Sequence, residues 1–202
     1  MKRTIFYKSF VLTMVIAGFL AGTIKAQDLK NALLLTKAEQ YDKAEEMLKQ
    51  LVQKEPSNSK YHFYLGENYL LTYFSDTISN SLAEFTGLAK EAFQKGVDAN
   101  PGDPLNYVGL AKVAVYLKDP STADQMRTKA SSLLLPYKNV RKMNPPAPEY
   151  AFALAKIAES YINDREVDTA SALPLIRHAL KLDSKNPEIY FIAGDIYNLA
   201  ND

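Results

Sequence analysis

Cysteine and tryptophan are absent from this 202-residue chain, and histidine is rare. Without cysteine, the chain has no disulfide and no lipid attached through an N-terminal cysteine. Histidine occurs only at His62 and His178, whereas zinc needs about three or four converging His, Cys or carboxylate ligands. The glycine-rich phosphate-binding patterns GxGxxG and GxxxxGKS are also missing. We therefore predict a protein that is not an enzyme and that uses no metal and no cofactor.

An excess of basic charge is also lacking once the N-terminal stretch is set aside. The whole chain has 24 Lys and Arg against 23 Asp and Glu. Four of the basic residues, Lys2, Arg3, Lys8 and Lys25, fall within residues 1–26, which contain no acidic residue. The remainder carries 20 basic and 23 acidic residues, a net charge of −3. Nucleic-acid binding normally requires a basic stripe or patch, so we predict no nucleic-acid partner.

Residues 1–26 have the three-part form of a secretory signal peptide. A basic start is followed by an apolar run from Phe10 to Leu20 and by the short end Ile24-Lys25-Ala26. Cleavage there would leave Gln27 as the first residue. The apolar run is about half of the roughly 20 residues that span a bilayer, so we expect no stable membrane span after cleavage. An uncleaved anchor is the alternative. Export to the periplasm or cell envelope of a Gram-negative bacterium follows from this interpretation.

The rest of the chain has the pattern of an all-α protein. From Asp28 onward, apolar residues recur at spacings of three and four in blocks of helical length, and no block alternates as a half-buried strand does. Helix-breaking residues separate the blocks. They are Pro56-Ser57-Asn58, Asn100-Pro101-Gly102-Asp103-Pro104, Asp119-Pro120, Asn144-Pro145-Pro146-Ala147-Pro148 and Lys185-Asn186-Pro187.

Two half-patterns recur along the chain. The first is Ala44, Leu48, Leu51, Pro56, which returns as Ala89, Phe93, Gly96, Pro101 and, more loosely, as Ala172, Ile176, Ala179, Ser184. The second is Leu65-Gly66 with Tyr69, which returns as Leu110-Ala111 with Ala114, Leu154-Ala155 with Ala158, and Ala193-Gly194 with Tyr197. Small residues at these positions allow two helices to approach closely, while large ones fill the ridges between hairpins.

This pattern resembles the tetratricopeptide repeat family, in which a helix with W-x2-L-G-x2-Y precedes one with A-x3-F and a closing proline. The resemblance implies an all-α, right-handed superhelical solenoid of antiparallel helix hairpins. One domain, 27–202, would contain four repeats and one unpaired helix. We place them near 27–58, 59–103, 104–137, 148–186 and 187–202.

Three departures from a regular repeat are predicted. Extra residues around Thr72 to Leu82 predict longer helices with a protruding turn, and further extra residues lie around Asn163 to Ser171. Residues 138–147 form a proline-rich crossing. The two insertions contain Asp76-Thr77-Ile78 and Asp168-Thr169-Ala170, which resemble acceptor sites of some bacterial periplasmic O-glycosylation systems.

The final block, 187–202, has the pattern of a first helix with no second helix after it, and it is apolar on several sides. We expect that the chain is a fragment and that further repeats follow in a parent protein. The alternative is self-association through residues 187–202.

The resemblance implies a function in protein or peptide binding, because first helices of the family line a concave groove. Repeat position 5 is Leu29, Phe63, Val108, Phe152 and Phe191, and position 9 is Leu33, Glu67, Lys112, Lys156 and Asp195. An apolar row beside a charged row suits an extended peptide or a partner helix. Capture of an acidic C-terminal tail, a known binding mode of this family, needs basic or amide residues at these groove positions. This chain has Phe63 and Glu67 at two of them, so we do not expect that mode.

We therefore predict a non-catalytic scaffold that holds a protein or peptide partner in its groove. The groove residues are Phe63, Glu67, Val108, Lys112, Phe152, Lys156, Phe191 and Asp195. The alternative is a structural or oligomerisation module of a larger multi-repeat parent protein.

Overall fold

The structure, a computed structural model, describes residues 27–134, 148–163 and 167–200. Within these ranges the chain forms nine helices and no strand, which confirms the all-α class. The predicted signal peptide (1–26) and the crossing 138–147 lie outside the described residues. The helices are 27–37, α2 (Tyr41–Lys54), α3 (Ser59–Ser75), α4 (Leu82–Ala99), α5 (Pro104–Tyr116), α6 (Pro120–Ser132), α8 (Pro148–Ile162), α9 (Thr169–Leu182) and α10 (Pro187–Ala200).

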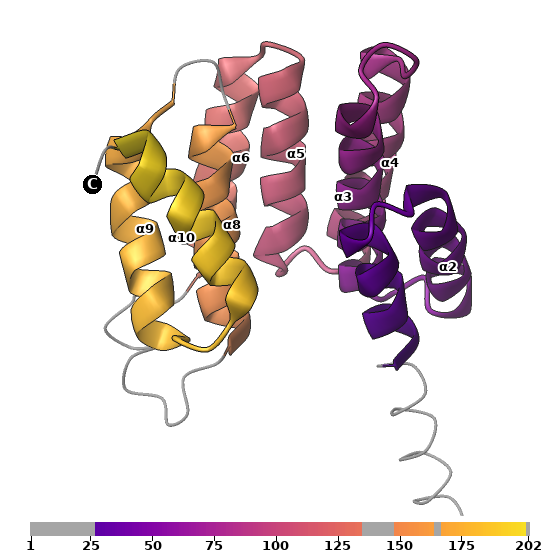
Figure 1. Cartoon of the computed structure of the whole chain (residues 1–202), viewed down its shortest axis with the longest axis horizontal. Helices are drawn as coiled ribbons and strands as arrows, with labels where there is room; N and C mark the ends of the chain where they lie inside the picture. Colours follow the sequence, from indigo (N-terminus) through magenta and orange to yellow (C-terminus); the bar gives the residue numbers. More distant parts are fainter. Residues whose placement is uncertain (1–26, 135–147, 164–166, 201–202) are drawn as a thin grey trace, which may run out of the picture.

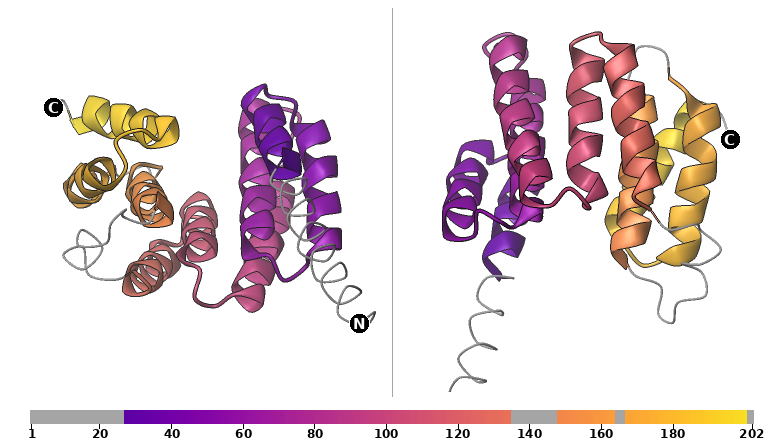
Figure 2. Two further views of the ribbon diagram at one scale, coloured as in Figure 1. Left: turned by 90° about the horizontal axis from the view of Figure 1, so that it is seen from below. Right: turned by 180° about the vertical axis from the view of Figure 1, so that it is seen from behind.

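The helices pair as antiparallel hairpins and form a solenoid (Figure 1). Helix α3 pairs with α4, α5 with α6, and α8 with α9, while α10 packs on α8 and α9. Segment 27–37 precedes α2, and Lys54 on α2 lies 3.9 Å from Asp28 on this segment. The first helices α3, α5, α8 and α10 contact one another in succession. The second helices α6 and α9 lie outside α5 and α8 in the view from below (Figure 2). This is the helical-repeat solenoid expected from the recurring half-patterns.

A phenylalanine ring lies between two glycines where successive hairpins meet. Phe93 on α4 is fully buried. A Cβ atom added to Gly66 on α3 would lie 2.5 Å from this ring, and one added to Gly109 on α5 would lie 2.3 Å from it. The close approach predicted at Gly66 is therefore confirmed. At Gly194 on α10 no described atom lies within 4 Å of an added Cβ, so the approach expected there is not present among the described residues.

The second repeat is longer than the third, as its insertion predicts. Helices α3 and α4 contain 17 and 18 residues, whereas α5 and α6 contain 13 each. The turn that joins α3 to α4 is closed by Asp76, whose Oδ1 accepts hydrogen bonds from the backbone N–H groups of Ile78 and Ser79 at 3.1 and 3.0 Å. Ile78 is almost fully exposed at the tip of this turn, so the expected protruding turn is confirmed.

A buried arginine joins the third repeat to the fourth. Arg127 on α6 donates hydrogen bonds to the backbone carbonyl and the hydroxyl of Ser160 on α8. It also pairs with Asp124 at 3.0 Å, and its guanidinium lies 4.6 Å from the ring centre of Tyr161. These contacts hold α8 against α6, and α8 in turn contributes to the candidate site.

Among the described helices, none has the length and apolar character needed to cross a membrane.

Candidate functional site

The apolar row predicted at repeat position 5 does not form a continuous open surface. Phe63 and Val108 are completely buried, and Phe152 is partly buried. The Phe63 ring lies 6.0 Å from Phe93 and 6.5 Å from Phe152, centre to centre. The contact with Phe152 joins α3 directly to α8, across the intervening α5. The stack of first helices curves tightly enough to bury Phe63 and Val108 in the core. These two residues present no surface to a partner, which corrects their assignment to an open groove.

The predicted charged row forms an ion network among the first helices. Lys112 on α5 lies 3.0 Å from Glu67 on α3 and 2.7 Å from Glu159 on α8. Lys156 on α8 lies 3.3 Å from Glu67, 3.2 Å from Glu159 and 3.3 Å from Glu188 on α10. The two ammonium groups are almost completely buried. Glu67, Lys112 and Lys156 therefore pair with one another and with two glutamates that the groove prediction omitted.

The network keeps its members charged despite their burial. Burial alone would raise the pKa of Glu159, but the ammonium groups of Lys112 and Lys156 outweigh it and lower this pKa to about 2. Burial would lower the pKa of Lys156, but Glu159, Glu67 and Glu188 outweigh it and hold this pKa well above its usual range. The same balance raises the pKa of Lys112. Each of these charged groups has a partner of opposite charge, so the network's direct role is to join α3, α5, α8 and α10.

Two of the predicted groove residues lie apart from this cluster. Phe191 and Asp195 are on the exposed side of α10, and Phe191 has 75% of its surface exposed. Helix α10 packs through its opposite side, where Ile189, Ile192 and Ile196 are buried. Phe191 and Asp195 therefore remain accessible but are not brought together with Phe63, Glu67 or Lys112 by any described contact.

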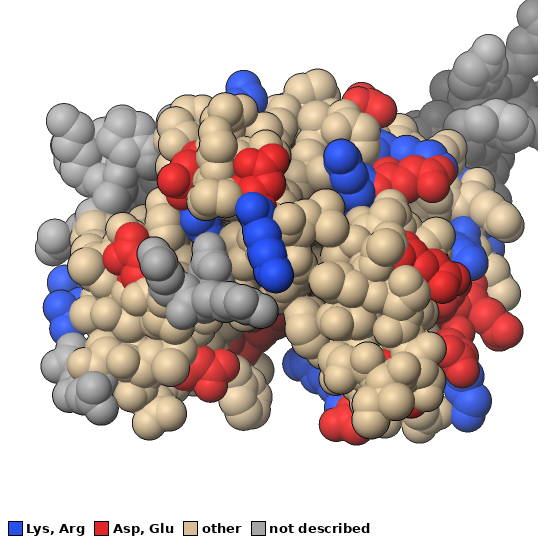
Figure 3. Space-filling model, turned by 90° about the horizontal axis from the view of Figure 1, so that it is seen from above, with Lys and Arg blue, Asp and Glu red and all other residues tan. Residues whose placement is uncertain are grey.

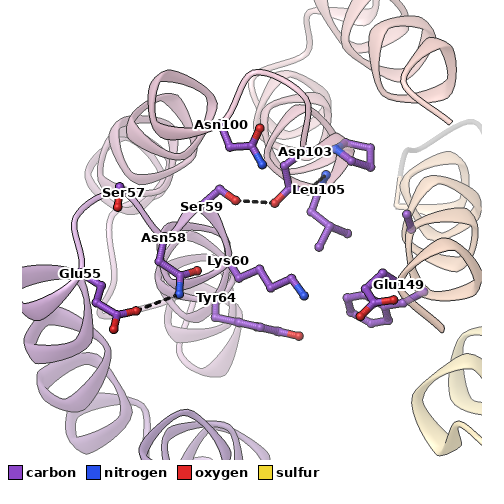
Figure 4. Close-up of a pocket in the computed structure, with 13 residues that line it drawn as sticks. Glu55, Ser57, Asn58, Ser59, Lys60, Tyr64, Asn100, Asp103, Leu105 and Glu149 are labelled. Carbon is purple, nitrogen blue, oxygen red and sulfur yellow. Dashed lines mark hydrogen bonds between the residues drawn. The ribbon is translucent and has the colours of Figure 1, made fainter. Parts of the chain in front are cut away.

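A pocket of about 710 Å³ opens at the N-terminal ends of α3, α5 and α8 (Figure 4). Its apolar walls come from Tyr64, Leu105 and Phe152. Lys60 and Glu149 extend into the same space in Figure 4. The remaining lining residues belong mostly to the turns before α3 and α5: Glu55, Ser57, Asn58, Ser59, Asn100, Asp103, Pro104 and Ala153.

Hydrogen bonds fix the turn side of this pocket. Asp103 accepts hydrogen bonds from the Ser59 hydroxyl at 2.7 Å and from the backbone N–H of Leu105 at 3.0 Å. Glu55 accepts one from the Asn58 side chain at 3.3 Å. Lys60 and Glu149 are exposed, and neither forms an ion pair with another described residue. The pocket thus combines apolar walls and preset turns with two charges that are available to a partner.

The sequence prediction missed most of this pocket, although a signal for it existed. Lys60, Leu105 and Glu149 all occupy repeat position 2, which also faces the groove in the resembled family. The groove prediction from the sequence rests on repeat positions 5 and 9 alone. Of the predicted groove residues, Phe152 alone lines the pocket.

His62 lies in the same part of the molecule, on α3 beside the turn that precedes this helix. His62 is buried, and its Nε2 lies 2.8 Å from the Pro56 carbonyl oxygen, so it packs against the turn before α3. Within the described residues, no three His, Asp or Glu side chains are grouped so that they could hold a metal ion. Basic and acidic side chains are interspersed on the face seen from above (Figure 3).

Comparison with known proteins identifies the class of this fold. The chain is an α-helical repeat solenoid, and its residues 29–72 match the tetratricopeptide repeat family model. The structure is similar to that of TTC0263, a thermophilic TPR protein of Thermus thermophilus, with a TM-score of 0.58 and 17% identity over 82% of this chain and 77% of that one. This similarity and the family match confirm the predicted resemblance to tetratricopeptide repeat proteins.

A weaker similarity is to YrrB, described as a TPR protein with an unusual peptide-binding site, with a TM-score of 0.42 and 17% identity over 86% of this chain and 76% of that one. No curated protein sequence matches the chain. At this level of identity, the structural likeness establishes the fold alone.

Proposed function

We propose that this protein is a non-catalytic scaffold that holds a protein or peptide partner at the pocket formed by the N-terminal ends of α3, α5 and α8. The observation that carries the proposal is the combination of apolar walls, Tyr64, Leu105 and Phe152, with the accessible charges Lys60 and Glu149. Apolar pockets with a few convergent polar groups are the usual form of a binding site. Three consecutive repeats contribute to it, so its shape depends on the solenoid being assembled.

The contacts beside the pocket support a preformed site. The Phe63 ring lies edge-on to Tyr64 at 5.2 Å and to Phe152 at 6.5 Å. The buried Phe63 therefore supports two of the pocket walls from behind. A preorganised wall reduces the entropy that binding must offset.

A library of random peptides displayed on phage tests this proposal. Selected peptides are measured against the unaltered protein and against two variants, Lys60→Trp at the pocket and Lys90→Trp on α4. Both lysines are exposed helical residues, but only Lys60 lines the pocket. We expect Lys60→Trp to weaken binding by at least about tenfold, or ~1.4 kcal/mol, because the indole occupies the pocket. Equal affinity for the two variants would contradict the proposal.

We also propose that the protein is exported, on the basis of the basic start, the apolar run and the end Ile24-Lys25-Ala26 in residues 1–26. The intact mass of the protein purified from the cell envelope tests this. A chain that begins at Gln27 is expected, and a chain that retains Met1 would contradict cleavage.

A second candidate function is a structural or oligomerisation module. The observation that favours it is the exposed face of α10, where Tyr190, Phe191 and Leu199 expose 53%, 75% and 46% of their surfaces. A stable oligomer that dissociates when Phe191 is replaced would favour this alternative.

A further inference from the structure

The pocket at the ends of α3, α5 and α8 carries an excess of negative charge. The carboxylates of Asp103 and Glu149 line it, and neither forms an ion pair with another described residue, against the ammonium group of Lys60. Asp103 is held by the Ser59 hydroxyl and the Leu105 N–H. Neither of these donors carries a charge, so Asp103 retains its negative field. Glu149 forms no ion pair with another described residue.

The neighbouring ion network carries a net negative charge. The network joins three glutamates, Glu67, Glu159 and Glu188, to only two lysines, Lys112 and Lys156. Glu188 lies at its edge with 36% of its side chain exposed.

Tyr64 forms part of the pocket wall and is largely buried. Burial raises its pKa to about 12, and the carboxylates of Glu188, Glu67 and Asp103 add to the shift, opposed by Lys156. Its hydroxyl stays neutral at any physiological pH. The ring and hydroxyl together offer an apolar surface with a hydrogen-bond donor and acceptor.

The apolar walls also suit the stem of a long cationic side chain. Arg and Lys bury their methylene groups along apolar surfaces while their charged ends reach carboxylates or water. The Phe152 ring already has one cation beside it, the ammonium of Lys156 at 5.6 Å from the ring centre. A second cation that approached from the pocket would be attracted by Glu149 and by the aromatic faces.

We infer that the pocket selects a partner segment that presents an arginine or lysine side chain, which packs its stem between Tyr64, Leu105 and Phe152 and directs its charge to Glu149 and Asp103. This inference rests on the proposed function and specifies the chemistry of the partner. Lys60 is the pocket-lining cation that opposes such a ligand.

Three matched peptides test the inference: Ac-Ser-Arg-Leu-Ser-NH2, the same peptide with citrulline in place of arginine, and the same peptide with glutamate. Citrulline has nearly the shape of arginine but no charge. Each peptide is titrated into the isotope-labelled protein, and the backbone amide NMR signals of Tyr64, Leu105 and Phe152 are followed. We expect the arginine peptide to bind roughly fivefold more tightly than the citrulline peptide, as for the loss of one exposed ion pair. The glutamate peptide should bind most weakly.

Two variants test which charged residues of the pocket determine the affinity for the arginine peptide. Glu149→Gln should weaken the arginine peptide by about threefold, and Lys60→Gln should strengthen it by a similar factor. Glu84→Gln is the matched control, because Glu84 also lies in the first turn of a helix, α4, and is exposed away from the pocket. It should leave the affinity unchanged.

If the signals of the pocket residues give the same affinity for all three peptides, the preference for a cation is overturned. That result would not contradict peptide binding at the pocket. A Glu149→Gln variant that behaves like Glu84→Gln would overturn the assignment of Glu149. No shift of the pocket signals with the arginine peptide at millimolar concentration would overturn the inference entirely. The proposed function would then still be tested separately by the peptides selected from the library.

Discussion

Phe93 determines how closely α3 and α5 approach each other. Its ring touches the backbone of both helices because Gly66 and Gly109 have no side chain there. A larger residue at either glycine would have to displace an aromatic ring that is already fully buried. Protein interiors are close-packed, so such a displacement spreads to neighbouring side chains.

We expect Gly66→Ala to lower the free energy of unfolding by about 1–3 kcal/mol, because the added methyl group would lie 2.5 Å from the Phe93 ring. Gly87→Ala is the matched control. Gly87 lies inside α4, and no described atom is within 4 Å of its added Cβ. That change should stabilise the protein by roughly 0.5–1 kcal/mol through helix propensity. Urea unfolding followed by circular dichroism measures both. A Gly66→Ala variant as stable as Gly87→Ala would refute the close packing.

Several of the described helices begin at a residue whose side chain accepts a hydrogen bond from a backbone N–H of the first turn. Side chains of Ser81, Asp103, Asp119 and Asp168 accept a backbone N–H at the start of α4, α5, α6 and α9. Helix α2 follows Gln40, whose side chain makes no such bond. The caps satisfy N–H groups that have no partner within the helix, and the Asp103 cap also shapes the candidate pocket.

Asp168→Ala should destabilise the protein by about 1 kcal/mol, because the Asp168 carboxylate accepts the Ser171 N–H at 2.9 Å. The hydrogen bonds from Ser171 also lower the pKa of Asp168, so the cap persists until the solution is distinctly acidic. Gln40→Ala, at the uncapped start of α2, serves as the comparison and should change stability little. The midpoint of urea unfolding measures both. An equal loss in the two variants would show that the cap contributes nothing of its own.

The ion network connects four helices from four repeats and gives the whole molecule a predictable response to acid. The folded-state pKa of Glu159 is about 2, below its usual value of 4.5. The stabilisation is therefore complete above about pH 5 and is lost as the pH falls toward 2. The two lysines have raised pKa values, so their contribution is present at neutral pH and is lost only in strongly alkaline solution.

Glu159→Gln should destabilise the protein at pH 7 by up to ~3 kcal/mol, because two buried ammonium groups lose a shared partner. At pH 3 the variant and the unaltered protein should differ much less. The free energy of unfolding in urea is measured at both values. Glu84→Gln should follow the unaltered protein throughout. A Glu159→Gln variant whose deficit is the same at pH 3 as at pH 7 would argue against a charged Glu159.

At the scale of the whole fold, the helices and their repeat can be predicted from the sequence, but the curvature of the stack cannot. Proline-containing turns and the spacing of Ala44, Leu48 and Gly66 predict individual hairpins from local rules. Curvature depends on small rotations accumulated over several hairpins. It brings Phe63 against Phe152 from a repeat two steps away, and no local pattern contains that contact.

The same curvature explains why the candidate site was only partly predictable. Glu67, Lys112 and Lys156 share one repeat position, and their opposite charges on neighbouring first helices could have suggested the observed ion pairs. Their burial could not be predicted, because it depends on how closely α3, α5 and α8 converge. The pocket at Lys60, Leu105 and Glu149 arises where the same helices diverge at their N-terminal ends.

The most direct test of partner binding at this pocket is hydrogen–deuterium exchange of the protein with and without a peptide selected from the library. We expect added protection at the N-terminal ends of α3, α5 and α8, in the segments that contain Tyr64, Leu105 and Phe152. Protection confined to α4, α6 and α9, or to the exposed face of α10, would contradict the assignment of this pocket as the binding site.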